Sequence, residues 1–297
     1  MSNFNNIEAD FENKYNSEAI GNFIPNTNIE IMREIPHTGK FQHALFDFDG
    51  TLSLIREGWQ SVMAELMLEA LSETPNVEDE ATLKDFVDEL ILKTTGKQTI
   101  YQMIELGAEV EKRGGIPYSS MEYKNEYTKR LMVKIEHRRE DLKNKKLSPT
   151  DMTVNGTFEL LEALKNLDVK LYLASGTDEC FVKEESTLVD VAKYFDGHIY
   201  GALEDHKKFS KAMVIEKILK ENQIDGSLLL GFGDGFVEID NTKCAGGTAI
   251  GVAIDEKAAN GTIDPIKRQR LLGVGADIII PDYSNAKELA SYLMECK

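Results

Sequence analysis

The chain has 297 residues, of which 42% are hydrophobic and 29% are charged, as in an ordinary globular protein. Its net charge of −17 argues against nucleic acid or an anionic membrane surface as a partner, and an anionic substrate would need local help from a metal ion or a few lysines. No signal peptide or membrane span is visible, and Cys180, Cys244 and Cys296 show no CxxC spacing, so we expect free thiols in a cytoplasmic protein.

Residues 1–40 are polar and rich in asparagine, with one apolar patch at residues 29–32. We expect a loose arm or a strand-like leader there. A first strand is predicted at His43–Phe46, and the pattern is then helical to about residue 155. One face of the first predicted helix is apolar through Trp59, Val62, Met63, Leu66, Met67, Ala70 and Leu71. Further helices are predicted over residues 78–93, 98–112 and 119–139.

Beyond Pro149, helices and strands alternate. Strands are predicted over residues 169–174, 198–200, 227–232, 248–254 and 277–280. Helices are predicted over residues 156–167, 178–193, 210–222 and 285–296. Short, nearly continuous apolar strands separated by helices imply an α/β fold, with a parallel sheet covered on both faces. Ligands bind such sheets at the C-terminal ends of the strands.

The first predicted strand runs directly into the segment DFDGT, residues 47–51. Asp47 and Asp49 point the same way if the strand stays extended, and the second curls over the first if the chain begins to coil. Gly50 permits a turn, and Thr51 offers a hydroxyl and an N–H group to an anion. Buried carboxylates are costly unless a cation or a reaction needs them, although a solvated Asp-Gly turn is the plain alternative.

Three later segments place polar residues near strand ends. Ser175 and Gly176, in ASGT, can hold a phosphate oxygen where a helix opens, although ASGT is equally suited to capping that helix. A lysine within residues 205–211 can lie between a phosphate and a carboxylate. Asp234 and Glu238, in GDGFVE, can face the same cleft if a helical turn begins there. Acidic side chains with only oxygen donors suit Mg²⁺.

In this order, DFDGT, ASGT, a lysine before a helix and GDGxxE resemble the four motifs of the haloacid dehalogenase superfamily. The resemblance covers residues 42 to about 295. It implies a doubly wound, Rossmann-like parallel sheet built from residues 41–54 and 150–297, which follows the arm of residues 1–40. It also implies that residues 55–149 form a mobile α-helical cap between the first and second motifs.

The resemblance further implies the roles of the acidic residues. Asp47 is implied as the nucleophile that forms an aspartyl-phosphate, and Asp49 as the general acid and base. Mg²⁺ is implied as the cofactor, bound by Asp47, the backbone carbonyl of Asp49, and Asp234. Glu238 would lie in or near the coordination shell, since many relatives have Asp at this place.

The phosphate group would be held by Thr51, Ser175, Gly176 and one lysine. Lys208 is preferred, because the apolar pair of the following helix comes five and six residues later. Lys211 is the alternative.

Asp49 narrows the reaction within the superfamily. Members that cleave carbon–halogen or carbon–phosphorus bonds generally lack an acid there, and the absence of DKTGT argues against an ion-pumping ATPase. We therefore expect a Mg²⁺-dependent phosphohydrolase acting on a small phosphorylated metabolite, preferably a sugar phosphate. A phosphomutase is the alternative enzyme, and a non-catalytic protein that binds a phosphorylated ligand is the alternative of another class.

Four residues are candidates for substrate specificity. Arg56 and Trp59 follow the catalytic loop closely enough to contact a substrate, and Lys97 and Gln98 follow a break at residues 94–96. Each of them also has an ordinary structural explanation of equal weight, as a surface charge, a core aromatic residue or the start of a helix. A large cap that closes over the site favours small substrates.

Overall fold

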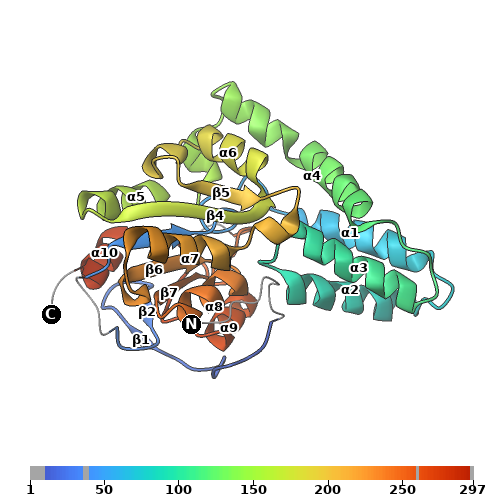
Figure 1. Ribbon diagram of the computed structural model, residues 1–297, viewed down its shortest axis with the longest axis horizontal. Helices are drawn as coiled ribbons and strands as arrows, with labels where there is room; N and C mark the ends of the chain where they lie inside the picture. The colour runs from blue at the N-terminus through green and yellow to red at the C-terminus, as the bar shows by residue number, and fades with distance from the viewer. Residues whose placement is uncertain (1–10, 36–39, 259–260, 295–297) are drawn as a thin grey trace.

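A computed structural model of the protein describes residues 11–35, 40–258 and 261–294 (Figure 1). Within these residues, one sheet has the strand order β1-β2-β8-β7-β6-β3-β4-β5. The strands are β1 (Asn22–Phe23), β2 (Glu30–Ile31), β3 (His43–Phe46), β4 (Lys170–Asp178), β5 (Ile199–Ala202), β6 (Leu229–Gly233), β7 (Thr248–Val252) and β8 (Ile278–Ile280). Every pair from β8 to β5 is parallel, which confirms the predicted α/β fold class.

Strand β3 lies in the middle of the parallel strands, between β6 and β4. Its register places Phe46 level with Phe232 of β6 and Leu173 of β4. All four residues of β3 are buried, because both faces of the sheet are covered. Asp47 therefore leaves a buried strand at the edge where neighbouring strands also end.

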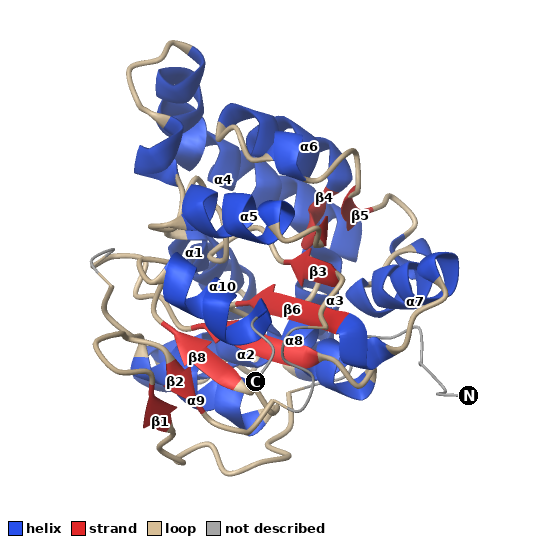
Figure 2. Ribbon diagram, turned by 90° about the vertical axis from the view of Figure 1, so that its left-hand side faces the viewer, coloured by secondary structure: helices blue, strands red, loops and turns tan. Residues whose placement is uncertain are grey.

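Helices cover the two faces of the sheet (Figure 2). On one face lie α5 (Thr157–Asn166), α6 (Glu179–Leu188) and α10 (Ala286–Met294). On the other lie α7 (Lys211–Asn222), α8 (Phe236–Cys244) and α9 (Pro265–Gly273). Alternate residues of β3 contact the two layers, since Phe46 packs in the cluster with α5 and Leu45 in the cluster with α7.

A helical bundle lies between β3 and β4 in the chain and to the right of the sheet in Figure 1. Its helices are α1 (Trp59–Ser72), α2 (Glu80–Thr94), α3 (Thr99–Lys112) and α4 (Ser120–Lys143). The apolar face predicted for α1 is buried except at Trp59 and Ala70, which are half-buried. Helix α4 is longer than predicted and carries the charged run of residues 137–143. The domain boundaries at residues 55 and 149 remain a prediction.

The described part of the N-terminal arm adds β1 and β2 to the sheet. Strand β2 pairs antiparallel with β8, with Glu30 opposite Ile279. Glu30 is buried, and both its carboxylate oxygens accept hydrogen bonds from Arg268, at 2.9 and 2.7 Å. The strand-like form of the arm is therefore observed around residues 22–31, while residues 1–10 lie outside the described residues.

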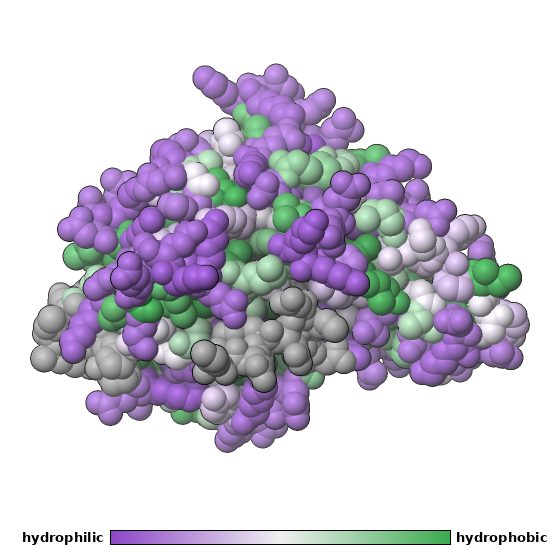
Figure 3. All heavy atoms as spheres, viewed as in Figure 1, coloured by the Kyte–Doolittle hydropathy of each residue, from purple (hydrophilic) through white to green (hydrophobic). Residues whose placement is uncertain are grey.

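The molecular surface is mostly hydrophilic on the face that Figure 3 shows, as the composition leads us to expect. Figure 3 shows that hydrophilic side chains cover much of the visible face, with hydrophobic residues scattered among them. None of the described helices combines the length and the apolar character needed to cross a membrane. Cys180 and Cys244 are exposed free thiols, and Cys296 lies outside the described residues.

Candidate active site

A cavity at the C-terminal ends of the parallel strands collects most of the predicted site residues. The sheet and its loops contribute Asp47, Asp49, Ser175, Gly176, Thr177, Lys211 and Asp234 to its lining. The helical bundle and the segment leading into it contribute Arg56, Trp59, Thr95, Gly96, Lys97, Thr99, Gln102 and Tyr127. The cavity therefore lies between the edge of the sheet and the bundle.

Asp47 lies at the base of this cavity, directly after β3. Its backbone N–H donates to the carbonyl of Phe232 at 2.9 Å, which continues the pairing of β3 with β6. One carboxylate oxygen, Oδ1, lies 2.9 Å from Nζ of Lys211. Burial raises the pKa of Asp47 well above its usual value, Lys211 opposes this shift, and Glu238 and Asp234 add to it. A further cation beside Asp47 would favour its charged form.

Lys211, and not Lys208, reaches the site. Lys211 is the first residue of α7 and is only 1% exposed, and its Nζ lies between Asp47 and Glu238. Lys208 belongs to a short 3-10 helix, His206–Lys208, where its exposed side chain pairs with Asp205 at 3.3 Å. The structure therefore contradicts the expected position of Lys208 in the site, because the 3-10 turn directs its side chain to solvent.

Three carboxylates form a cluster that fits a divalent cation. Asp47, Asp234 and Glu238 each offer an oxygen, and these oxygens lie within 4.8 Å of one another. The donor set contains only oxygen, which Mg²⁺ prefers. Glu238 is the least available member, because its Oε1 accepts from the Gly235 N–H at 2.6 Å and its Oε2 lies 2.7 Å from Nζ of Lys211.

Asp49 is held by hydroxyl groups from the end of β4. Its Oδ2 accepts a hydrogen bond from Oγ1 of Thr177 at 2.8 Å and another from Oγ of Ser175 at 3.3 Å. Its Oδ1 lies 3.7 Å from Nε of Arg56 and has no hydrogen bond among the described residues. Burial raises the pKa of Asp49, and Arg56 opposes that shift.

The second motif differs from the prediction in its backbone. Strand β4 continues through the motif to Asp178, and α6 begins only at Glu179. Ser175 therefore lies on extended chain and not at a helix N-terminus. Its hydroxyl accepts from the backbone N–H of Thr177 at 3.1 Å. A Cβ atom at Gly176 would lie 2.9 Å from the carbonyl oxygen of Lys97, so glycine allows the bundle to approach here.

Thr51 connects two loops of the site and does not line the cavity. Its side chain is fully buried, and its Oγ1 accepts from the backbone N–H of Asp234 at 3.0 Å. Gly50, with φ of +71°, lies against the same aspartate, since a Cβ atom there would be 2.3 Å from Asp234 Oδ2. These contacts hold Asp234 beside the loop that carries Asp47.

Of the four specificity candidates, Arg56, Trp59 and Lys97 line the cavity. Gln98 is fully buried, and its Nε2 donates to the carbonyl of Phe209 at 2.8 Å, so its amide joins the bundle to the core. Gln98 is not among the residues that line the cavity.

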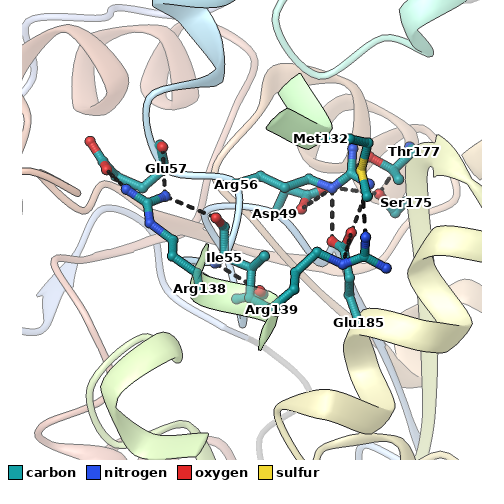
Figure 4. Close-up of polar contacts among 11 residues, drawn as sticks. Asp49, Ile55, Arg56, Glu57, Met132, Arg138, Arg139, Ser175, Thr177 and Glu185 are labelled. Atoms are coloured by element: carbon teal, nitrogen blue, oxygen red, sulfur yellow. Dashed lines mark hydrogen bonds and ion pairs between the residues drawn. The ribbon is translucent and has the colours of Figure 1, made fainter. Parts of the chain in front are cut away.

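Arg56 is held by Glu185 of α6, as Figure 4 shows. Its Nε and Nη2 donate to the two carboxylate oxygens of Glu185 at 2.8 and 2.9 Å. Arg138 of α4 donates to the backbone carbonyls of Ile55 and Glu57, on either side of Arg56. Arg56 is therefore fixed at two places, since Glu185 holds its guanidinium group and Arg138 holds the backbone around it.

Several residues of the site are not among those predicted from the sequence. Thr177 lies within the ASGT segment, and its hydroxyl was a usable signal. Tyr127 lies inside a predicted helix, where an aromatic residue usually marks a packed face. Glu185 carried no sequence signal, because its partner Arg56 is far away in the chain.

The comparisons with known proteins agree with this geometry. The sequence profile of the haloacid dehalogenase-like hydrolases matches residues 41–246, more than half of the chain. The chain therefore belongs to the haloacid dehalogenase-like hydrolase family. No curated protein matches the chain.

Several solved structures share the fold. A predicted phosphatase from Clostridium acetobutylicum is 18% identical, with a TM-score of 0.54 over 84% of this chain and 98% of that chain. A predicted phosphoglycolate phosphatase from Haemophilus somnus is 17% identical, with a TM-score of 0.52 over 84% and 98%. A putative β-phosphoglucomutase from Thermotoga maritima is 20% identical, with a TM-score of 0.50 over 85% and 100%. At these identities the likeness establishes the fold.

Proposed function

We propose that this chain is a Mg²⁺-dependent phosphatase that hydrolyses small phosphate monoesters, preferably sugar phosphates, through an aspartyl-phosphate. One observation carries the proposal. Asp47, Asp49 and Lys211 enter the same cavity, with Nζ of Lys211 2.9 Å from the Asp47 carboxylate. A carboxylate nucleophile, a second carboxyl group and a buried cation are the groups that a two-step phosphoryl transfer needs.

In the first step, an Asp47 oxygen attacks phosphorus and the bond to the leaving oxygen breaks. Protonated Asp49 gives its proton to that oxygen, so the product leaves as a neutral alcohol. Asp49 Oδ1 suits this transfer because Oδ2 is already occupied by Thr177 and Ser175. Lys211 lies where it can stabilise the charge of the phosphoryl oxygens.

In the second step, a water molecule attacks the phosphorus of the aspartyl-phosphate. Asp49, now ionised, accepts the proton of that water, and phosphate and the Asp47 carboxylate are released. Asp49 thus serves first as an acid and then as a base. The hydrogen bonds from Thr177 and Ser175 hold it in one place for both steps.

Asp47 and Asp234, with the backbone carbonyl of Asp49, would hold the Mg²⁺ ion. The ion would offset repulsion between the acidic cluster and a phosphate dianion in a chain with a net charge of −17. Glu238 acts mainly through Lys211 and the N–H of Gly235, since both its oxygens are engaged.

The bundle side of the cavity supports a small, polyhydroxylated substrate. Trp59 and Tyr127 offer aromatic surface, while Thr99 and Gln102 offer hydrogen-bonding groups on the same wall. Aromatic rings that pack against a sugar, beside groups that bond its hydroxyls, are a common way to hold such a ligand. The cavity lies between the sheet edge and the bundle, and a bundle over the site favours a small metabolite over a protein segment.

A panel of phosphorylated metabolites, assayed for released phosphate with Mg²⁺, tests the proposal. We expect turnover of at least one sugar phosphate and none by Asp47→Asn. A wild-type chain that binds phosphate esters but releases no phosphate from any of them, or from p-nitrophenyl phosphate, would indicate the non-catalytic alternative.

A phosphomutase is the second candidate, because contacts beside the cavity join the bundle to the core. Gln98 bonds the carbonyl of Phe209, and Lys124 of α4 bonds Asp178 at the end of β4. Such contacts limit the access of water, which a mutase must keep from its phosphorylated aspartate. Product analysis separates the two, since a phosphatase yields free phosphate and a mutase yields an isomeric phosphate ester.

A further inference from the structure

Lys267 lies behind the acidic cluster, in contact with one of its members. Its Nζ is 2.7 Å from Oδ2 of Asp234 and 2.7 Å from Oε1 of Glu256. All three side chains are largely buried. Lys267 is therefore a buried ammonium group with two carboxylate partners, the arrangement of a salt-bridged cation.

The fold brings Lys267 and Glu256 together through the loop that follows β7. An antiparallel bridge between Ile254 and Ile263 returns the chain to the sheet edge. Asp264 then caps α9 by accepting from the backbone N–H of Lys267 at 3.0 Å. This fixed backbone holds the lysine in the first turn of α9.

Lys267 meets Asp234 from outside the cavity. Neither Lys267 nor Glu256 lines the cavity, whereas Asp234 does. With Oδ2 engaged, Asp234 has Oδ1 left to offer to a cation. The backbone beside this carboxylate is also fixed, because the Asp234 N–H donates to Thr51.

The charges of Lys267 and Glu256 cancel. Lys267 alone would weaken the attraction of the cluster for a divalent cation, and Glu256 alone would weaken its attraction for a phosphate dianion. As a pair, they contact Asp234 and leave the total charge of the site unchanged. A salt bridge needed only for folding would not have to contact a member of the cation cluster.

We propose that Lys267 and Glu256 are a charge-neutral pair that balances the affinities of the site for Mg²⁺ and phosphate through its contact with Asp234. The inference rests on the proposed function for the identity of that cation. The two residues do not touch the substrate, and their effect is measured as the affinities of the chain for Mg²⁺ and for phosphate.

Titration calorimetry of the full chain, first with Mg²⁺ and then with inorganic phosphate at saturating Mg²⁺, tests the pair. Lys267→Gln removes a positive charge, so we expect Mg²⁺ to bind at least about threefold more tightly and phosphate at least about threefold more weakly. Glu256→Gln removes a negative charge, so we expect both shifts in the opposite direction. The double variant should return both affinities to within about twofold of wild type.

Lys243→Gln is the matched control. Lys243 also pairs with a buried carboxylate, that of Asp277, but it lies at the other end of α8 from Asp234. The variant changes the net charge equally, so we expect both affinities to stay near wild type. Thermal melts verify that each variant is folded. If Lys267→Gln does not fold, the shifts expected of Glu256→Gln still test the pair.

Opposite shifts in the two single variants, restored in the double variant, would support the pair. Unchanged affinities, or shifts of both single variants in the same direction, would overturn the inference and leave the proposed function intact. Failure of the wild-type chain to bind Mg²⁺ would overturn both.

Discussion

The two walls of the cavity differ in the elements that supply their side chains. On the sheet side, Asp47, Asp49 and Asp234 leave strand ends and are fixed by Lys211, Thr177 and Lys267 through contacts of 2.7–2.9 Å. On the bundle side, the lining residues come from helices α1, α3 and α4, from the loop between α2 and α3, and from the segment before α1. Under the proposed function, this difference would separate reactivity from selectivity. The sheet would carry the reacting groups, and the bundle could vary around them.

The largest expected effect is on the sheet side, at the nucleophile. Asp47→Asn keeps the shape of the side chain and removes its charge, so phosphate release should fall by at least about a thousandfold. Thermal melting should show that the variant is folded. Turnover near that of wild type would contradict the role of Asp47 and remove the distinction between the two walls.

The next largest loss of activity is expected at Lys211, with the neighbouring Lys208 as its comparison. Lys211→Met leaves Asp47 and Glu238 buried without their partner, so we expect an activity loss of about a hundredfold and a loss of several kcal/mol in the free energy of unfolding. Lys208→Met is the control and should change neither quantity, because its side chain is exposed. Equal losses in both variants would contradict the placement of Lys211 in the site.

The role of Asp49 is tested with two leaving groups. Asp49→Asn cannot donate a proton, so hydrolysis of an alkyl phosphate should slow strongly. Hydrolysis of p-nitrophenyl phosphate should slow less, because p-nitrophenolate needs little protonation to leave. If kcat falls equally with both substrates, Asp49 acts mainly by placing the metal ion.

The fourth prediction concerns the metal ion. EDTA should abolish activity and Mg²⁺ should restore it, whereas Ca²⁺ should bind without supporting turnover because its looser coordination misplaces the nucleophile. Asp234→Ala should raise the Mg²⁺ concentration needed for half-maximal activity sharply, and Glu238→Ala should raise it less. Full activity in EDTA, or an unchanged Mg²⁺ requirement in Asp234→Ala, would refute this assignment.

The smallest effect is expected on the bundle side. Tyr127→Phe removes one hydroxyl from the wall, so KM for a sugar phosphate should rise by severalfold, about the effect of one lost hydrogen bond. The kcat for p-nitrophenyl phosphate should stay near that of wild type. A larger loss of kcat than of affinity would show that this wall also takes part in the reaction.

Much of the fold could be predicted from the sequence, because its strands and helices are strongly periodic. The strand at His43–Phe46 was predicted at its observed bounds, and α1 buries most of the face that its pattern indicated. The parallel order explains why motifs far apart in the chain meet at one edge. The helix α9 was missed, since its charged sequence shows no clear apolar period.

The remaining differences arise from tertiary contacts that a local pattern does not contain. Strands β1 and β2 have two residues each and form only because β8 offers an open edge. Spacing alone favoured Lys208, but a 3-10 turn and the start of α7 decide which lysine is buried. Lys267 could not be anticipated, because its contacts depend on how the loop after β7 returns to the sheet.

The edge of the sheet at β8 has a consequence for solubility. Strand β8 is a run of three buried isoleucines, Ile278–Ile280, with β7 on one side and β2 on the other. Without β2, the backbone donors and acceptors of this apolar strand would be open to pairing with a second chain, as in aggregation through sheet edges. The arm closes that edge with two very short strands and with Glu30, a charged residue turned inward onto Arg268. A segment remote from the cavity thus covers the apolar strand that would otherwise be open to pairing with a second chain.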